Sequence, residues 1–216
     1  MDESDVCHAR PRFIPLIRML EARALHRLNV GPIELMLDSG ACISISGKSG
    51  SGKSVLLRML ADLDPHDGDV FLDGEACSAM PAPTWRRRVS YVSAESGWWD
   101  ERVAAHFSAD TDFAALLPSV GIPVEASSWP ITRLSTGERQ RLALLRALRP
   151  ANRVLLLDEP TSGLDVGSVA LVEALLKERL ARGISILMVT HDPEQAVRMA
   201  SRHLELRDGR LLERKP

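Results

Sequence analysis

The chain has 216 residues, of which 45% are hydrophobic and 26% are charged, as in an ordinary globular protein. This length suits one substantial core and is short for two independent domains. A formal net charge of −2 gives no sign of nucleic-acid binding, and no apolar run approaches the roughly 20 residues that span a bilayer. The acidic start (MDESD) is unlike a secretory signal, so we expect a cytosolic protein or one on the cytosolic face of a membrane.

The first half of the chain predicts strands around one clear helix. Residues 1–13 have the composition of a loose arm. The segment 54–63 (SVLLRMLADL) has leucines at helical spacing and is followed by Pro65 and Gly68, which predicts a helix that ends there. The expected strands are a pair within 16–37 on either side of a turn at 29–32 (NVGP), and then 41–46, 69–74 and 86–93.

The second half alternates helices with buried strands. Residues 95–133 have no strand pattern and contain three prolines, which favours a small, mostly helical insert. Asp192 is expected to cap a helix, with Pro193 in its first position and Gln195 completing a capping box. The other elements expected are a helix at 136–149, a strand at 153–159, a helix at 166–183 with Gly183 as its C-cap, a strand at 184–190 and a hairpin at 203–213.

Three cysteines, Cys7, Cys42 and Cys77, occur without a C-x-x-C pair. An odd number with these spacings argues against a disulfide framework or a zinc site. The alternation of strands and helices implies an α/β fold with a mostly parallel sheet covered by helices. Ligands of such sheets bind beyond the carboxyl ends of the strands, so we look there for functional residues.

Residues 47–54 (GKSGSGKS), which we call the phosphate loop, match G-x-x-x-x-G-K-[ST] between a predicted strand and a predicted helix. Small residues let backbone N–H groups point at phosphate oxygens, and the following helix adds its positive N-terminal end. The lysine can reach the β- and γ-phosphates, and the last serine can ligate Mg²⁺. A flexible glycine linker is the alternative, but linkers rarely stand between a buried strand and an amphipathic helix. The predicted phosphate-binding residues are Gly47, Ser49, Gly50, Ser51, Gly52, Lys53 and Ser54.

A second candidate group ends the strand 153–159 (RVLLLDE). Asp158 stands at the carboxyl end of this strand, where it can hold Mg²⁺ through water. Glu159 follows and can act as the base for an attacking water. The alternative is a strand that simply ends in solvated acids, and the phosphate loop makes the functional interpretation the better one.

Three further motifs suggest a family. Residues 134–141 (LSTGERQR) lie shortly before 154–165 (VLLLDEPTSGLD), and 190–192 (THD) follow the next strand. With the phosphate loop, these segments resemble the nucleotide-binding domain of ABC transporters over about residues 16–213. The segment LSTGE stands where that family has its LSGGQ signature, with Thr136 in place of a glycine.

The resemblance implies one ABC ATPase domain over residues 1–216. Its fold would be a P-loop NTPase (RecA-like) core, a mostly parallel sheet flanked by helices. A small antiparallel β part and a short helical subdomain, inserted at about 95–150, would complete it. The resemblance further implies a head-to-tail homodimer in the ATP-bound state, in which two ATP molecules and Mg²⁺ are sandwiched between the copies.

The family pattern also implies roles for individual residues. Ser135 and Gly137 of one copy would touch the γ-phosphate that is held by the phosphate loop of the other copy. A helix N-terminus at this place suits an anion. Glu159 would polarise water, His191 would contact the γ-phosphate, and Asp165 would link the two sites. A solvated histidine at a helix start is the alternative for His191.

The sequence departs from the family pattern at two places. Where the family has a glutamine that touches Mg²⁺, this chain has Ala94 followed by Glu95. Our hypothesis is that Glu95 replaces it as a metal-side ligand, and the alternative is that Glu95 points to solvent. The family also stacks adenine on an aromatic residue, but residues 16–47 contain none, so His26 or the stem of Arg27 is a candidate substitute.

Two adjacent tryptophans, Trp98 and Trp99, stand out in a chain with only 4% aromatic residues. Neighbours in a strand or helix do not share one buried face, so at least one is expected to be exposed. In ABC proteins this region receives the membrane subunit, which favours docking over packing of both rings in the core. We interpret the basic run 85–89 (WRRRV) as a solvated edge.

The resulting prediction is an ATP-hydrolysing subunit that powers transport through a separate transmembrane permease subunit and binds no nucleic acid. Its expected place is cytoplasmic and peripheral, on the cytoplasmic face of the cell membrane. The alternative is a soluble ABC-type ATPase that is not involved in transport. The transported substrate is not encoded in such a subunit, although the chain has a slight resemblance to ATPase subunits linked to metal export.

Overall fold

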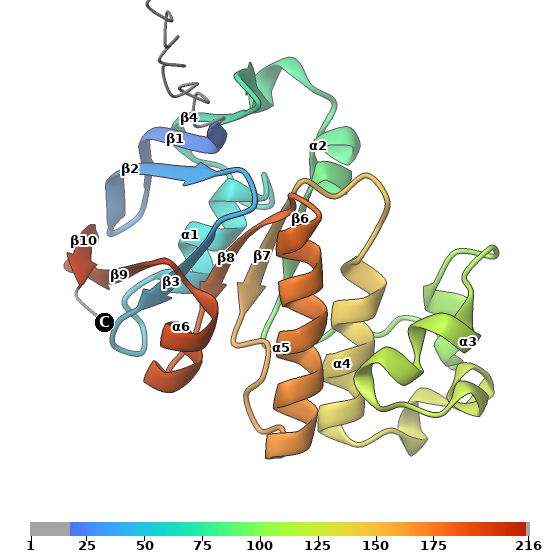
Figure 1. Cartoon of the computed structure of the whole chain (residues 1–216). Helices are drawn as coiled ribbons and strands as arrows, with labels where there is room; N and C mark the ends of the chain where they lie inside the picture. The colour runs from blue at the N-terminus through green and yellow to red at the C-terminus, as the bar shows by residue number, and fades with distance from the viewer. Residues whose placement is uncertain (1–17, 215–216) are drawn as a thin grey trace, which may run out of the picture.

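The computed structural model describes residues 18–214 (Figure 1). The strands are β1 (Arg18–Arg27), β2 (Val30–Asp38), β3 (Cys42–Ser46), β4 (Asp67–Leu72), β5 (Glu75–Ala76), β6 (Val89–Val92), β7 (Val154–Asp158), β8 (Ser185–Val189), β9 (Arg202–Arg207) and β10 (Arg210–Arg214). The α-helices are α1 (Lys53–Leu60), α2 (Ala82–Arg88), α3 (Phe113–Leu116), α4 (Thr136–Ala147), α5 (Val166–Ala181) and α6 (Pro193–Met199). The 3-10 helices are Cys77–Ala79, Val103–His106, Pro118–Val120, Val124–Ser128 and Ile131–Arg133.

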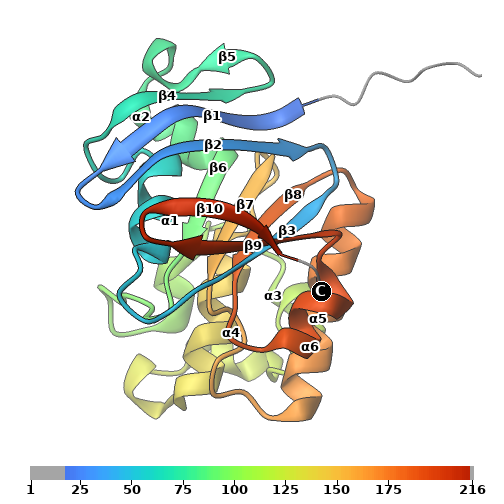
Figure 2. The same cartoon turned by 90° about the vertical axis from the view of Figure 1, so that its left-hand side faces the viewer.

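Two sheets organise these elements. The larger sheet has the order β10-β9-β3-β8-β7-β6, in which the strands from β9 to β6 run parallel and β10 returns antiparallel to β9. The smaller sheet, β2-β1-β4-β5, is antiparallel, and Figure 2 shows it as a separate layer. The predicted α/β fold, with its mostly parallel sheet and small antiparallel part, is therefore confirmed.

The central strands β7 and β8 are buried along their whole length. Successive strand residues point to opposite faces. Leu156 and Leu187 accordingly join the core with α1 and the small sheet, whereas Leu155 and Ile186 join the core with α4 and α5. Burial on both faces explains why these segments are continuous apolar runs rather than alternating ones.

Most predicted elements lie where the sequence analysis expects them, but two predictions are wrong. The strand expected at 86–93 begins only at Val89, because residues 86–88 form the last turn of α2. Pro83 stands in the first turn of this helix, and Trp85 buries its ring and donates to the carbonyl of Leu60 at 3.0 Å, so packing fixes a helix there.

The capping box expected at α6 is also wrong. Asp192 does cap the helix, since its Oδ1 accepts from the backbone N–H groups of Glu194 and Gln195. The Gln195 side chain, however, is fully buried and donates to Thr161 instead of reaching back to the cap. Tertiary packing thus overrides the local motif.

The insert at 95–133 consists of one four-residue α-helix and short 3-10 helices joined by loops. Its small core joins that of α4 and α5. None of the helices within residues 18–214 combines the length and the apolar character needed to cross a membrane. The loose arm expected at 1–13, with Cys7, lies outside the described residues. Cys42 and Cys77 are free, and burial raises the pKa of their thiols to about 12 and about 11.

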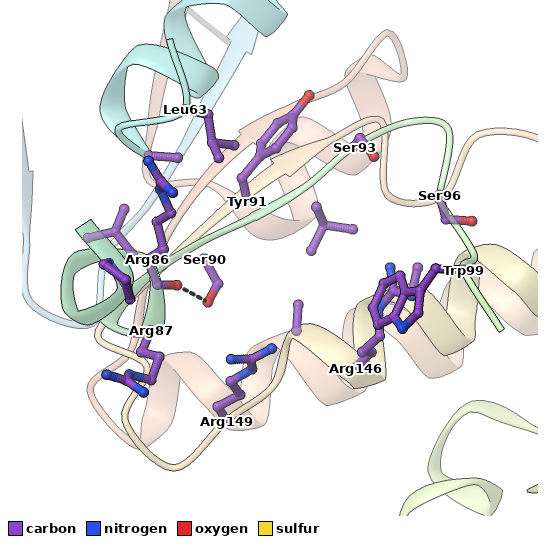
Figure 3. A pocket seen from close by; sticks show the side chains of 16 residues that line it. Leu63, Arg86, Arg87, Ser90, Tyr91, Ser93, Ser96, Trp99, Arg146 and Arg149 are labelled. Carbon is purple, nitrogen blue, oxygen red and sulfur yellow. Dashed lines mark hydrogen bonds between the residues drawn. The ribbon is translucent and has the colours of Figure 1, made fainter. Parts of the chain in front are cut away.

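A hollow of about 520 Å³ lies between the α2–β6 segment and α4, and we call it the arginine groove (Figure 3). Four arginines line it, Arg86, Arg87, Arg146 and Arg149. Trp99 also lines this groove and is 71% exposed, whereas Trp98 is partly buried against the core that the insert shares with α4 and α5. The prediction that at least one of the two tryptophans is exposed is confirmed.

Candidate functional site

The register across three parallel strands brings the candidate residues to one edge of the sheet. Ile45 of β3 pairs with Val189 of β8, and Val189 pairs with Asp158 of β7. Neighbouring strands lie about 4.8 Å apart, so β3 and β7 are separated by roughly 10 Å at this row. The phosphate loop begins two residues after Ile45, Glu159 follows Asp158, and His191 stands two residues after Val189. All three therefore converge at the carboxyl edge of the sheet.

The phosphate loop wraps around its own lysine. Lys53 is the first residue of α1 and is only 8% exposed. Its Nζ donates to the carbonyl oxygens of Gly47 at 2.8 Å and Lys48 at 3.0 Å. A phosphate group would offer this ammonium group charged acceptors, which form stronger hydrogen bonds than carbonyls. The loop thus holds a positive charge in place for an anion.

Residues of neighbouring strands pack closely against two glycines of this loop. Gly47 and Gly52 have φ values of +148° and +99°, which favour glycine. A Cβ at position 47 would lie 2.5 Å from the carbonyl oxygen of Leu206, and one at position 52 would lie 2.2 Å from Cγ2 of Val30. The path of the loop is therefore fixed by β2 and β9, unlike that of a flexible linker.

Several groups in the loop fit a bound phosphate. Ser51 Oγ is buried and has no hydrogen-bond partner among the described residues. The N-terminus of α1 has no side-chain cap and no acidic residue in its first turn, so its N–H donors are free for an anion. Ser49 and Gly50 form the exposed tip of the loop, and the hydroxyl of Ser54 is exposed at the start of α1. Together these features suit the phosphates of a nucleotide.

Asp158 is a buried acidic residue at the same carboxyl edge of the sheet. Its side chain is only 5% exposed, and its Oδ2 accepts a hydrogen bond from the hydroxyl of Tyr91 at 3.1 Å. Burial raises the pKa of Tyr91, so the phenol stays protonated and keeps donating. Mg²⁺ prefers one or two carboxylate ligands together with waters and phosphate oxygens, and Asp158 with Ser54 fits that donor set. Tyr91 could not be found from the sequence, because only the β6–β7 pairing places it beside Asp158.

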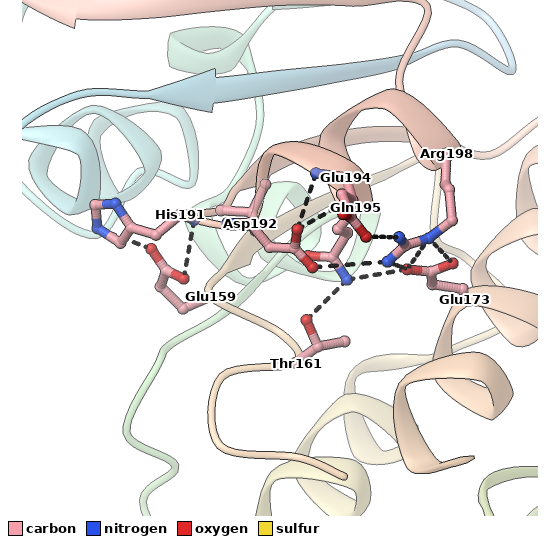
Figure 4. Close-up of polar contacts among 9 residues, drawn as sticks. Glu159, Thr161, Glu173, His191, Asp192, Glu194, Gln195 and Arg198 are labelled. Carbon is pink, nitrogen blue, oxygen red and sulfur yellow. Dashed lines mark hydrogen bonds and ion pairs between the residues drawn. The ribbon is translucent and has the colours of Figure 1, made fainter. Parts of the chain in front are cut away.

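Glu159 and His191 contact each other at the same edge (Figure 4). Glu159 Oε1 lies 3.2 Å from His191 Nε2, and its Oε2 accepts from the His191 backbone N–H at 3.4 Å. Burial raises the pKa of the Glu159 carboxyl, and the nearby His191 opposes this shift. A carboxylate with a raised pKa is a stronger base, which suits proton transfer from water. Gln140 of α4 donates to the Glu159 carbonyl at 2.6 Å, another contact that sequence reasoning missed.

The start of α4 carries a capping box. Ser135 Oγ accepts from the backbone N–H of Glu138 at 3.2 Å, and Glu138 Oε2 accepts from the Ser135 backbone N–H at 2.8 Å. Glu138 Oε2 also accepts from the Ser135 hydroxyl at 2.8 Å. Figure 1 shows this end of α4 well apart from the loop that precedes α1. Within one copy, Ser135 and Gly137 therefore do not join the phosphate loop.

Asp165 caps α5. It accepts from the backbone N–H of Ser168 at 3.0 Å and from the Ser168 hydroxyl at 2.6 Å, and these bonds lower the pKa of Asp165. Arg141 of α4 donates to the same hydroxyl. The starts of α4 and α5 are thus connected through Ser168.

The side chain of Glu95 is exposed, and it follows β6 on the loop that leads to the insert. Its backbone carbonyl accepts from the Ser93 hydroxyl at 2.5 Å. This contact fixes the backbone of the loop, and the role of Glu95 as a metal-side ligand stays a prediction.

The two candidates for contact with adenine are engaged elsewhere. His26 Nδ1 lies 3.9 Å from Oδ2 of Asp67, and Arg27 donates to the carbonyl of Pro65 at 2.6 Å. Leu28, at the turn between β1 and β2, is 72% exposed. The exposed apolar side chain at this turn is thus that of Leu28, which is aliphatic and not aromatic.

Sequence comparison identifies one family and a set of similar proteins. A family model described as "ABC transporter" matches residues 30–162. An aliphatic sulfonates import ATP-binding protein from Pseudomonas putida is 39% identical over 82% of this chain and 67% of its own length. Relatives of the same name from Paracoccus denitrificans and Burkholderia pseudomallei (strain K96243) are 37% and 34% identical, over 85% and 97% of this chain. The chain covers 74% and 65% of the length of these two relatives, so it spans only about two thirds of several of the proteins it matches.

Solved structures share the fold. The ATP-binding cassette MJ0796, in a dimeric post-hydrolysis state bound to ADP and Pi, superposes with a TM-score of 0.80 at 23% identity, over 91% of this chain and 98% of that one. A bacterial Atm1-family ABC exporter with ATP bound gives a TM-score of 0.79 at 20% identity, over 92% of this chain and 39% of that one. At these identities the likeness concerns the fold alone.

Proposed function

Because the chain belongs to the ABC transporter family, we propose that it binds ATP and hydrolyses it to power transport through a separate membrane permease. The observation that carries this proposal is the convergence of the phosphate loop, Asp158, Glu159 and His191 at the carboxyl edge of β3, β8 and β7. Bound ATP would replace the carbonyl oxygens that now accept from Lys53 with phosphate oxygens.

Mg²⁺ would neutralise phosphate charge at this site, and the residues that suit it are Ser54 and Asp158, with Glu95 as a further candidate. Tyr91 keeps Asp158 oriented through its hydrogen bond. Glu159 takes the proton of the attacking water, for which its buried carboxyl with a raised pKa is well suited. His191, held against Glu159, stands where it can donate to the γ-phosphate.

The complete site requires two copies. Ser135 and Gly137 lie at the start of α4, away from the phosphate loop of their own chain. In a head-to-tail dimer, this helix start would face the γ-phosphate held by the partner copy and contribute N–H donors to it. Asp165, connected to α4 through Ser168, would stand between the two sites.

The permease partner would dock at the arginine groove and the exposed Trp99. Exposed aromatic residues and arginines are typical anchors of protein interfaces. Membrane subunits of this kind would keep the chain on the cytoplasmic face of the membrane. The relatives are named for the import of aliphatic sulfonates, so an alkanesulfonate is the substrate class we propose. These names give the idea of metal export no support.

A matched pair of variants tests the ATPase proposal. Lys53→Met removes the buried charge of the phosphate loop, and Lys48→Met removes an exposed charge from the same loop. We expect Lys53→Met to abolish measurable nucleotide binding and ATP hydrolysis, and Lys48→Met to keep both within about threefold of the wild type. Equal activity of Lys53→Met and the wild type would refute the assigned site.

The transport role has its own test. With the permease reconstituted in liposomes, ATP hydrolysis should depend on the permease and rise with an alkanesulfonate. Trp99→Ala should weaken assembly with the permease more than hydrolysis by the free subunit. Hydrolysis that ignores the permease would favour a soluble ATPase without a transport role.

A further inference from the structure

We propose that the buried hydrogen bond between Gln195 and Thr161 is a positioning element of the hydrolytic site, which holds His191 against Glu159 (Figure 4). The inference rests on the proposed ATPase function and adds to it residues that touch neither phosphate nor metal. Gln195 and Thr161 are the positioning residues, and the pair of Glu173 with Arg198 supports them.

The bond joins the two segments that carry the contact between Glu159 and His191. Thr161 stands two residues after Glu159, and Gln195 stands four residues after His191, on the first turns of α6. Gln195 Nε2 donates to Thr161 Oγ1 at 2.7 Å, and Gln195 is fully buried. The same two segments are thus joined twice, by the 3.2 Å contact between Glu159 and His191 and by the hydrogen bond between Thr161 and Gln195.

The position of Gln195 is fixed from the other side by α5. The Glu173 carboxylate is 6% exposed and accepts from Arg198 Nε at 3.0 Å and from Arg198 Nη2 at 2.8 Å. Gln195 Nε2 lies 3.5 Å from Glu173 Oε1, at the limit of a hydrogen bond. A buried carboxylate is tolerated only when it is paired, and this pair connects α6 to α5. α6 itself has only seven residues, too few to hold its place by helix stability alone.

If position 195 served packing alone, an amide there would be less favourable than an apolar side chain. Its Oε1 is buried and has no hydrogen-bond partner among residues 18–214. An unpaired buried polar atom costs free energy that an apolar side chain of similar volume would avoid. An open hollow of about 680 Å³, lined by Glu159, Thr161 and His191, lies beside the Thr161 end of the bond. What the amide contributes here is the directed bond to Thr161.

Within residues 18–214, the hydrogen bonds of Lys53 go to the carbonyls of Gly47 and Lys48 and not to Thr161 or Gln195, and Lys53 acts on Glu159 only through its charge. Breaking the bond should therefore disturb the geometry of Glu159 and His191 and change nucleotide binding by less than twofold, because the phosphate loop keeps its own contacts and only the contact from His191 to the γ-phosphate is weakened. This separation distinguishes positioning from general stabilisation.

The test compares Thr161→Val, which removes the hydroxyl at nearly constant volume, with Thr161→Ser, which retains it. We expect Thr161→Val to lower kcat about tenfold, in line with the loss of one well-formed hydrogen bond, with KM and the Kd for ATP within twofold of the wild type. Thr161→Ser should restore most of the lost kcat. An unchanged kcat in Thr161→Val, or a Kd that worsens in parallel with kcat, would overturn the proposal.

A double-mutant cycle adds Gln195→Met, which keeps the volume but not the amide. If the two side chains act through their mutual bond, Thr161→Val/Gln195→Met has about the same kcat as the lower of the two single variants. Multiplicative losses would mean that the residues act separately, and the proposal would fail. Gln195→Met also provides the measurement if Thr161→Val does not fold.

Hydrogen exchange gives a readout that does not depend on ATP hydrolysis. In the nucleotide-free protein, Thr161→Val should speed amide exchange at 160–165 and at 191–196, whereas Thr161→Ser should not. Unchanged exchange in both segments would contradict the proposed tie. A wild type without ATPase activity, but with this exchange pattern, would refute the proposed function and not the tie itself.

Discussion

The close approach of Val30 to Gly52 gives a quantitative prediction about the phosphate loop. Gly52 has a φ of +99°, and a Cβ placed on it would lie 2.2 Å from Val30 Cγ2. Val30 is fully buried, so its methyl group has no open space to move into. Gly50 in the same loop has a φ of +75°, but a Cβ there would meet nothing within 4 Å. Comparing an alanine substitution at Gly50 with one at Gly52 therefore separates the cost of backbone strain from the cost of steric overlap.

The expected losses follow from these two contributions. An L-residue in a left-handed conformation costs about 1–2 kcal/mol, which applies to both Gly50→Ala and Gly52→Ala. Overpacking of a dense core adds about 1–3 kcal/mol at position 52 only. We thus expect Gly52→Ala to lower the free energy of unfolding by about 3 kcal/mol or more, and Gly50→Ala by about half of that.

Urea unfolding of the nucleotide-free protein, followed by circular dichroism, measures both losses. Val30→Ala removes the overlapping methyl group, so Val30→Ala/Gly52→Ala should be less destabilised than the sum of the single variants, by about 1–3 kcal/mol. Equal losses in Gly50→Ala and Gly52→Ala, or strict additivity in the double variant, would refute the reasoning that packing of β2 fixes the path of the loop.

Three further predictions concern other parts of the site. Glu138→Ala should lower stability by about 1 kcal/mol near pH 7. The hydrogen bond from the Ser135 backbone lowers the pKa of the Glu138 carboxyl below its ordinary value of 4.5. The stability that Glu138 contributes is therefore fully present above pH 4.5 and is lost as the pH falls through the lowered pKa. In urea unfolding, the difference between Glu138→Ala and the wild type should vanish in acid. Glu95→Ala should raise the Mg²⁺ concentration needed for half-maximal ATPase, and an unchanged requirement would exclude Glu95 as a metal ligand. The turn between β1 and β2 exposes Leu28, which is aliphatic and cannot stack on a base as an aromatic ring does. The Kd values for ATP and GTP should therefore agree within about tenfold, and a much larger preference for ATP would contradict weak base stacking.

Much of the fold could be predicted from local patterns. The glycines of the phosphate loop stand between an apolar strand and a helix with leucines at helical spacing, and both elements form as expected. Strand β7 (Val154–Asp158), within the predicted segment 153–159, is buried because its run of leucines suits a sheet covered on both faces. Each of these patterns lies within a short stretch of sequence, so it can be interpreted without knowing which other segments it contacts in the fold.

The features that the sequence analysis missed depend on contacts between distant segments. The donation from Tyr91 to Asp158 requires that β6 be the neighbour of β7, and nothing in either segment specifies that order. Gln195 looks like part of a capping box, yet its amide lies against Thr161, which is 34 residues earlier in the chain. The start of α2 was missed because a basic run has no apolar period, and only the buried Trp85 reveals the helix.

The proposed mechanism requires two copies of this chain to close around ATP, and the mass of a hydrolysis-deficient variant in solution shows whether they do. Glu159→Gln keeps the shape of the site and removes the base, so bound ATP should persist. Light scattering should show a monomer for this variant without nucleotide, and a dimer when both ATP and Mg²⁺ are present. A mass that stays monomeric at saturating ATP and Mg²⁺, with ATP binding verified separately, would contradict the account.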